Sequence, residues 1–325
     1  MSPGSEDRLL AWLRRRLAAE PGTPLLGDDG AVLPSRAFAV TVDSQIAGVH
    51  FPPDLPEPAL ARRLLAVNLS DLAAMGADPA YGFLALSAVQ GFDHRRFFTA
   101  FLAACRRHGV RLAGGDLARQ PQTTTATLTL LGTRPPGGRF LRRSDARPGD
   151  HLWLSGTVGE SAAGRFLLAA AAQLPTPTVR RAARRAMRRH LEPTPHLSMG
   201  RFLGRQRRAA AIDLSDGLSL DLSRLCRESG VGARIDPAAL PLPPHFADLC
   251  RVIDRDPLQL ALSGGEDYVL LFALPAGHHP PAELGCTRIG EVKGGRRLEQ
   301  IVDGQVRALP VEGWDHLANR ATSRD

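Results

Sequence analysis

Strand-like and helix-like segments alternate along most of this chain, and this alternation constrains its fold more than any other feature. The short apolar runs typical of strands lie at 37–42, 81–89, 110–113, 123–131, 151–155, 210–214, 231–235 and 268–274. Segments with helical spacing lie at 57–76, 95–108 and 217–228, with another beginning near Ser161 and an arginine-rich region ending near Arg208. The pattern predicts a fold of mixed α and β class.

The length of the chain and a break in its composition predict two domains. A chain of 325 residues exceeds the size at which one hydrophobic core keeps growing, about 250–300 residues. The segment 134–150 is rich in Pro, Gly and Arg, which is typical of a linker. We expect an N-terminal domain at 1–140, a C-terminal domain at 141–325 and a ligand cleft between them.

The formal net charge of +8 comes from arginine, because Lys293 is the only lysine. A Walker A loop and the third strand of a protein kinase each need a lysine, and the turn-like sequence around Lys293 serves neither. Bound phosphate must then be held by arginine, backbone amides or metal. Nucleic acid is the alternative partner, but the arginine stretches at 180–189 and 201–208 do not alternate with aromatic residues as a stacking platform would. We interpret them as solvated helix faces and expect no nucleic acid partner.

The cysteines and the apolar runs bear on where the protein works. The four cysteines lie far apart without a Cys-x-x-Cys pair, which predicts reduced core thiols rather than a zinc site or disulfides. Residues 9–17 are typical of an amphipathic helix rather than a signal peptide, and no apolar run approaches transmembrane length. We expect a cytoplasmic protein with no membrane partner.

Acidic residues recur where predicted strands meet glycine turns. They are Asp28, Asp29, Asp43, Asp116, Asp213, Asp216, Glu266 and Asp267. A single aspartate in a turn is ordinary, because its side chain accepts hydrogen bonds from nearby backbone amides. A series of them at strand ends is typical of a ligand site, since proteins of mixed α and β class place ligands there.

The most informative segment is AVNLSDLAAMG at 66–76, where Asn68 and Asp71 share one face of an apolar helix. A buried carboxylate without a partner is strongly disfavoured, so this pair either binds a metal or ligand or forms an internal hydrogen bond. Oxygen donors without a His and Cys set suit a hard cation such as Mg²⁺, and Mg²⁺ implies phosphate. Glycine-rich turns at 156–161 and 215–218 offer helix N-termini for anions; ordinary capping by Ser161 and Asp216 is the alternative.

Eight short motifs follow one another in a specific order. They are GDDGAVL at Gly27, VTVDSQIAGVHF at Val40, AVNLSDLAAMGA at Ala66, LAGGD at Leu112, RSDARPGD at Arg143, SGTVGESAAG at Ser155, DLSDGLSLDL at Asp213 and LSGGEDYVLLF at Leu262. This series, which spans about 27–314, resembles that of the thiamine-monophosphate kinase family. The motif with His50 and the GGEDY motif favour this family over its relatives, namely aminoimidazole ribonucleotide synthetase, selenophosphate synthetase and hydrogenase-maturation proteins.

The resemblance implies a two-domain α+β fold like that of aminoimidazole ribonucleotide synthetase, with an α/β C-terminal domain. It implies a homodimer in which the N-terminal domains, at 1–140, join strands into a shared β-barrel and bind ATP and several Mg²⁺ ions. The C-terminal domain, at 141–325, would complete the nucleotide and substrate site. The implied reaction transfers a phosphoryl group from ATP to thiamine monophosphate, which gives ADP and thiamine diphosphate.

The resemblance also assigns roles to residues that match the motifs. The metal-binding positions would be Asp29, Thr41, Val42, Asp43, Asp71, Asp116, Asp213 and Asp216, and of these Asp71, Asp116 and Asp216 would be catalytic. Gly115, Arg143 and Ser215 would contact ATP, and His50, Glu266 and Trp314 would contact the thiamine phosphate. No general base is required, because an acceptor phosphate with a second pKa of about 6 is already a nucleophile near neutral pH.

Alternatives remain for individual residues and for the whole chain. His50 could pack under Phe51, Trp314 could anchor the C-terminal core, and Arg143 could only decorate the linker. The chain departs from the family pattern at Val42, which leaves only a backbone carbonyl as a donor, and at 117–120, where Leu-Ala-Arg-Gln replaces Thr-Thr-Arg-Gly. The rival functions are another ATP-dependent enzyme that activates a carbonyl or amide oxygen, and a degenerate nucleotide-binding regulatory protein.

Overall fold

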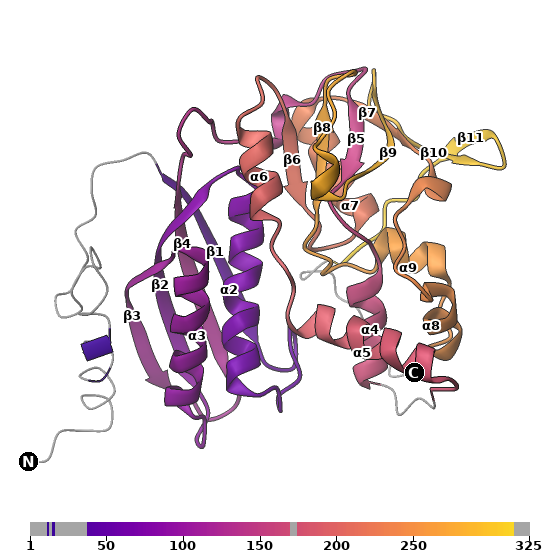
Figure 1. Cartoon of the computed structure of the whole chain (residues 1–325). Coiled ribbons are helices and arrows are strands. Elements are labelled where there is room, and N and C mark those ends of the chain that lie inside the picture. Colours follow the sequence, from indigo (N-terminus) through magenta and orange to yellow (C-terminus); the bar gives the residue numbers. More distant parts are fainter. Residues whose placement is uncertain (1–11, 13–14, 17–37, 170–173, 315–325) are drawn as a thin grey trace, which may run out of the picture. The chain divides into compact units, whose positions relative to one another are not determined.

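The computed structural model describes residues 12, 15–16, 38–169 and 174–314, and the chain divides into two compact units (Figure 1). Unit 1 comprises Met1–Phe140 and Thr194–Gln206, and unit 2 comprises Leu141–Pro193 and Arg207–Asp325. In the described residues, no helix has both the length and the apolar character needed to cross a membrane.

Unit 1 is built on a four-stranded sheet in the order β1-β4-β2-β3. Its strands are β1 (Phe38–Ile46), β2 (Asp78–Ala88), β3 (Arg111–Arg119) and β4 (Thr125–Thr133). Strands β1 and β4, and β4 and β2, pair antiparallel, whereas β2 and β3 pair parallel. The two edges of this sheet are therefore β1 and β3.

Helices α2 (Glu57–Ala74) and α3 (His94–His108) lie on one face of this sheet (Figure 1). Helix α3 begins where the Asp93 side chain accepts a hydrogen bond from the Arg96 backbone N–H, and it ends at Gly109, which has a φ of 72°. These are typical N-cap and C-cap signals. Helix α2 is buried along most of its length, which is why its sequence is apolar on almost every side.

Helix α6 (Leu197–Gly204) packs in unit 1, although it follows Leu141–Pro193 of unit 2 in the sequence. A Cβ atom at Gly200 would lie 2.2 Å from the carbonyl oxygen of Ala73, so the backbones of α6 and α2 touch there. Arg201 also forms an ion pair with Asp78 at the start of β2. The division at 140 and 141 predicted from sequence falls at a boundary of the units, but a single division of the chain misses this return.

Unit 2 is built on a seven-stranded sheet in the order β11-β10-β7-β9-β5-β8-β6. Its strands are β5 (His151–Leu154), β6 (Ala210–Asp213), β7 (Gly232–Ile235), β8 (Leu270–Leu274), β9 (Thr287–Lys293), β10 (Leu298–Val302) and β11 (Gln305–Ala308). All neighbouring strands pair antiparallel except β7 and β10. Short 3₁₀ helices lie before β5 at Arg143–Asp145, after β7 at Pro237–Ala239 and between β8 and β9 at Ala282–Leu284.

The helices of unit 2 are α4 (Glu160–Ala169), α5 (Pro177–Leu191), α7 (Leu218–Ser229), α8 (Phe246–Val252) and α9 (Pro257–Ser263). Residues from α4, α7, α8 and α9 form one core with the inner face of the sheet. A second, smaller core joins α4, α5 and α8. Helices α4 and α5 approach closely, because a Cβ atom at Gly164 would lie 2.1 Å from the carbonyl oxygen of Ala186.

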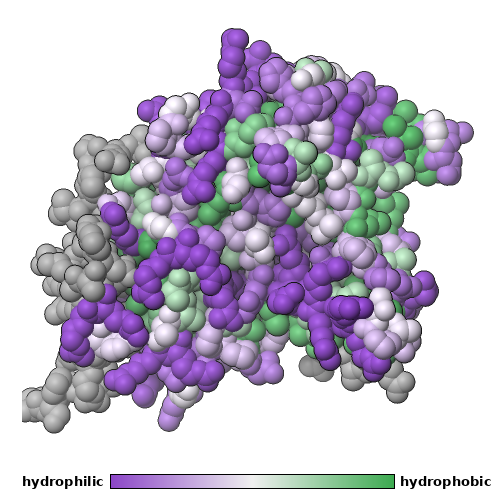
Figure 2. All heavy atoms as spheres, viewed as in Figure 1, coloured by the Kyte–Doolittle hydropathy of each residue, from purple (hydrophilic) through white to green (hydrophobic). Residues whose placement is uncertain are grey.

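The surface of the described residues is largely hydrophilic on the side that Figure 2 shows. Apolar side chains gather near the β10–β11 hairpin in that view, where Ile301 and Val306 are a cross-strand pair and both are exposed. On α5, Arg180, Arg184 and Arg188 are exposed, one turn apart, while Ala183 on the other side is buried. This arrangement agrees with the interpretation of the arginine-rich helix as a solvated face.

Candidate active site

In unit 1, two side-chain contacts fix how α2 lies along β1. The hydroxyl of Thr41 donates a hydrogen bond to the Asp71 carboxylate. Four residues further along the strand, the guanidinium of Arg63 donates to Oε1 of Gln45 at 2.7 Å. Residue numbers rise along β1 in the direction in which they fall along α2, so the two elements run antiparallel. Alternation along the strand places Asp43 on the same face as Thr41 and Gln45, so Asp43 lies between the Thr41–Asp71 and Gln45–Arg63 contacts on the face that α2 covers.

Asn68 and Asp71 take different partners in the structure. Asn68 is fully buried, and its amide nitrogen donates to the carbonyl oxygen of Leu64 at 2.9 Å, which is one helical turn back. Its side-chain oxygen, within the described part of the chain, has no hydrogen-bond partner. Asp71 instead accepts from Thr41 on the neighbouring strand. Of the two polar residues predicted from AVNLSDLAAMG, Asp71 is the one joined to another predicted metal-binding residue.

Asp43 and Asp116 lie inside strands, so the expectation that both follow the end of a strand is wrong. Strand β3 continues through Gly114, Gly115 and Asp116 to Arg119. A Cβ atom at Gly115 would lie 1.9 Å from the carbonyl oxygen of Leu84. The glycine therefore permits a close approach to β2 rather than a turn.

The register separates Asp116 from the Thr41–Asp71 pair. Asp116 pairs with Ala85, Ala85 with Thr127 and Thr127 with Ser44. Paired residues share a face, so Asp116 lies on the face of Ser44, which is opposite to that of Thr41. Three strand spacings, about 14 Å, also separate the two edges. Unit 1 of one chain does not bring Asp116 and Asp71 together.

His50 follows β1, at the end of the strand away from Asp71. Its Nδ1 accepts a hydrogen bond from the Ile46 backbone N–H at 3.1 Å, so a neutral ring carries its proton on Nε2. From Thr41 to Ile46 the strand spans about 17 Å. The neighbouring Phe51 is buried, so the Phe51 ring packs in the interior directly after His50. Nε2 is the nitrogen that can donate to an anion.

In unit 2, backbone hydrogen bonds draw three predicted site segments together. The Ser215 carbonyl oxygen accepts from the Glu266 N–H at 2.7 Å, and the Asp216 carbonyl oxygen accepts from the Trp314 N–H at 2.9 Å. Asp213 ends β6 directly before this loop and is 4% exposed. The five predicted site residues Asp213, Ser215, Asp216, Glu266 and Trp314 thus form one cluster.

Carboxylates crowd the N-terminal end of α7. Asp221 is fully buried, and its carboxylate accepts a hydrogen bond from the Asp216 backbone N–H at 3.0 Å. Arg224 donates to both Asp216 and Asp221. Burial, and then the nearby charge of Asp213, raise the pKa of Asp221 to about 7. Asp221 stands in the motif DLSDGLSLDL, but the motif alone did not single it out as a site residue.

The GGEDY segment has an unusual backbone conformation. Gly265, Glu266 and Tyr268 have φ values of 73°, 58° and 51°, and only glycine adopts such values readily. Strained residues of this kind concentrate at functional sites. A Cβ atom at Gly265 would lie 2.9 Å from the Ser215 carbonyl oxygen, which explains why glycine stands there.

Asp267 fastens this segment to the start of α4. Its carboxylate accepts backbone hydrogen bonds from Gly159 at 2.8 Å and Ser161 at 3.3 Å. Arg189 of α5 donates to its backbone carbonyl at 2.9 Å. Complete burial raises the pKa of Asp267 to about 7. The N-terminus of α4, which was predicted as an anion site, is thus occupied by a side chain of the protein itself.

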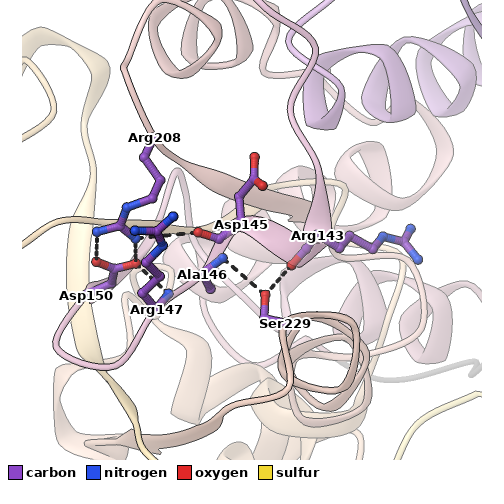
Figure 3. Close-up of polar contacts among 7 residues, drawn as sticks. All are labelled: Arg143, Asp145, Ala146, Arg147, Asp150, Arg208 and Ser229. Carbon is purple, nitrogen blue, oxygen red and sulfur yellow. Dashed lines mark hydrogen bonds and ion pairs between the residues drawn. The ribbon is translucent and has the colours of Figure 1, made fainter.

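Arg143 does not belong to the unit 2 cluster. Its backbone carbonyl accepts from the Ser229 hydroxyl at 2.6 Å, at the C-terminal end of α7, and Figure 3 shows its side chain extending away from the labelled residues. Ser215 precedes the other end of this helix, about 18 Å away along its axis. The segment is held by Arg208, which forms a two-point ion pair with the buried Asp150 (Figure 3).

The remaining predicted metal positions are Val42 and Asp29. The Val42 side chain is 59% exposed on the face of the sheet opposite to Thr41. Asp29 lies outside the described residues. Among the residues that the structure describes, no group of three or more His, Cys, Asp or Glu side chains has the geometry of a complete metal site. The roles assigned to individual residues stay predictions.

Two family models identify the class of protein to which this chain belongs. The family model for the N-terminal domain of AIR synthase related proteins matches residues 27–133, and that for the C-terminal domain matches 147–303. Together the models cover most of the chain, which therefore has the two-domain architecture of AIR synthase related proteins. The mixed α and β class and the two-domain fold predicted from sequence are confirmed.

Individual relatives identify the family within this class of proteins. Thiamine-monophosphate kinase of Salmonella typhimurium is 39% identical over 319 residues, which cover 93% of this chain and 94% of that protein. Thiamine-monophosphate kinase from Stenotrophomonas maltophilia K279a has a similar crystal structure, with 35% identity, a TM-score of 0.78 and coverage of 91% and 96%. AaThiL complexed with AMPPCP and TMP matches with 29% identity, a TM-score of 0.78 and coverage of 95% and 96%. This chain belongs to the thiamine-monophosphate kinase family, as its motifs predicted.

Proposed function

We propose that this protein transfers the γ-phosphoryl group of ATP to thiamine monophosphate, giving ADP and thiamine diphosphate in the biosynthesis of that cofactor. The observation that carries the proposal is the match to thiamine-monophosphate kinases over 93% of the chain, together with the clustering of Ser215, Asp216, Glu266 and Trp314 in unit 2. A relative whose structure holds AMPPCP and TMP is similar along nearly the whole chain. We place the reaction in the cytoplasm.

Magnesium ions fit the donors of both units. In unit 1 the donors are the Thr41 hydroxyl and the carboxylates of Asp71 and Asp43; in unit 2 they are the carboxylates of Asp213 and Asp216. All are hard oxygen ligands, which Mg²⁺ prefers. When bound, Mg²⁺ neutralises phosphate charge and aligns the two phosphates. The carboxylates would hold the ions, and the acceptor phosphate needs no base to become nucleophilic.

A homodimer with a shared barrel agrees with the sheet of unit 1. Both edge strands, β1 and β3, belong to predicted site segments. Val40 and Val42 are 60% and 59% exposed on the face of β1 away from α2, and exposed apolar edge strands tend to pair with another chain. Pairing of β1 and β3 with strands of a second copy would leave neither edge of this sheet open.

The test supplies ATP, Mg²⁺ and thiamine monophosphate to the purified protein at neutral pH and measures thiamine diphosphate. The proposed function predicts sustained turnover that stops without Mg²⁺. Another enzyme of the superfamily would give no thiamine diphosphate, and neither would a regulatory protein, although the latter would still bind ATP. Absence of product with fully folded protein therefore refutes the proposal.

Asp71→Asn is the matching residue-level test. The change removes negative charge but little volume, so we expect turnover to fall at least a hundredfold while the unfolding temperature stays within a few degrees of the wild type. Asp54→Asn is the control, because Asp54 is exposed on the same unit. Near-normal activity of Asp71→Asn would show that Asp71 serves only to pair with Thr41.

A further inference from the structure

His190, on the last turn of α5, touches a predicted substrate residue. Its Nδ1 lies 3.1 Å from Oε2 of Glu266 and 3.3 Å from the hydroxyl oxygen of Ser161. A carboxylate only accepts hydrogen bonds, so the Nδ1 hydrogen is donated to Glu266. His190 is 4% exposed, whereas the Glu266 side chain is 24% exposed. The buried ring thus holds a carboxylate that still reaches solvent.

The Glu266 backbone is held as tightly as its side chain. Its φ of 58° is unfavourable for a residue with a Cβ atom, and the Ser215 carbonyl oxygen fixes its N–H at 2.7 Å. The adjacent Asp267 is bonded to Gly159 and Ser161 at the start of α4. The backbone of Glu266 is therefore fixed, and the contact with His190 restrains the side-chain torsions that remain.

His190 lies on the face of α5 that packs in the smaller core of unit 2. The buried face of α5 carries Val179, Ala183 and Ala186, and His190 follows Ala186 by four residues, so it lies on the same face. A histidine at the end of an apolar face would ordinarily serve only packing. Its contact with a partly exposed carboxylate in a strained loop is what distinguishes it from a packed core residue.

We propose that His190 is a positioning residue, which orients the Glu266 carboxylate toward the organic part of the thiamine monophosphate substrate through the Nδ1–H hydrogen bond. This role rests on the proposed function. It predicts that loss of the ring impairs use of thiamine monophosphate much more than use of ATP, because ATP is assigned to other residues. A packing role alone would weaken both together, through loss of folded protein.

The experiment compares His190→Ala with His190→Asn. Steady-state kinetics should give about a tenfold higher KM for thiamine monophosphate in His190→Ala, as expected for loss of a hydrogen bond to a charged group, with KM for ATP within about twofold. His190→Asn should recover most of the loss, because the Asn amide nitrogen can take the place of Nδ1. His245→Asn is the control: His245 is an exposed histidine with a φ of 63°, a conformation that Asn tolerates.

A double-variant cycle decides whether His190 acts through Glu266. The partner change is Glu266→Asn, since Asn adopts positive φ more readily than most residues but is too short to keep the contact. In this background His190→Ala should change KM by less than about twofold. An equal loss in both backgrounds, or failure of His190→Asn to rescue a folded protein, overturns the proposal. Calorimetry of thiamine monophosphate binding in the presence of AMPPCP distinguishes failure of this proposal from failure of the proposed function. If the wild-type protein binds no thiamine monophosphate, the proposed function is refuted as well.

Discussion

Replacement of Gly164 by alanine tests the close approach of α4 and α5, which supports the positions of Asp267 and His190. The new Cβ atom would lie 2.1 Å from the carbonyl oxygen and 2.4 Å from the carbonyl carbon of Ala186. Non-bonded heavy atoms attract best at about 3.5–4.0 Å, so the helices must separate by more than about 1 Å. The obstacle is the backbone of α5, which cannot move aside as a flexible side chain would.

Two opposing effects set the size of the change. In an exposed helix, alanine is more favourable than glycine by about 1 kcal/mol. Overpacking of a closely packed contact costs about 1–3 kcal/mol, and backbone contact argues for the upper end. The net expectation is a loss of about 2 kcal/mol in the free energy of unfolding, which corresponds to a fall in Tm of about 4–8 °C for a domain of this size.

Thermal and urea unfolding followed by circular dichroism measure this change, and kinetics with thiamine monophosphate measure its effect on the site. Because α5 carries His190, KM for thiamine monophosphate should rise as well. Gly294→Ala is the matched control, since a Cβ atom at Gly294 meets nothing within 4 Å and its backbone is not in the left-handed region. If Gly164→Ala proves as stable as the wild type, or more stable, the proposed backbone contact between α4 and α5 is refuted.

Three further predictions follow from buried charge and from the metal-binding residues. Arg208→Ala should lower the free energy of unfolding by about 3–5 kcal/mol, because it leaves the buried Asp150 without its ion pair; Asp150→Asn combined with Arg208→Met should recover much of this in urea titrations. The folded-state pKa of Asp267 is raised from 3.8 to about 7, so its contribution to stability is fully present below about 3.8 and is lost as the pH rises to about 7. Unfolding of Asp267→Asn at a series of pH values should therefore show a flatter slope in this window than the wild type, and an unchanged slope would contradict this origin. Thr41→Val should raise the Mg²⁺ concentration needed for half-maximal activity several-fold, which a metal titration measures, and an unaltered titration would mean that the Thr41 hydroxyl serves only to orient Asp71.

Periodicity predicted most helices and strands correctly, but it misjudged one glycine motif. Gly114 and Gly115 looked like a turn, because glycine is common in turns. In the structure they lie inside β3, where a Cβ atom at Gly115 would strike the backbone of β2. Sequence alone does not distinguish a glycine needed for a turn from one needed for a close approach between strands, so Asp116 was expected at a strand end.

The sequence also concealed residues whose importance depends on tertiary contacts. His190 lies in a stretch dominated by arginine, and its place at the end of the apolar face of α5 was the available signal. The contact with Glu266 joins segments 76 residues apart in the sequence, which no local pattern reveals. In contrast, Ser215 and Asp216 stand in a motif that already marked them as candidate site residues, and the structure joins them to Glu266 and Trp314 in unit 2.

The return of residues 194–206 to unit 1 has a consequence for synthesis on the ribosome. Helix α6 completes the packing around Ala73 and Asp78, yet it is translated only after the first part of unit 2. At about 5–20 residues per second, the nascent N-terminal unit waits for seconds with the α6-binding side of α2 uncovered. Unit 1 can therefore complete its packing only after residues up to Gln206 have been translated, when the first part of unit 2 has already left the ribosome.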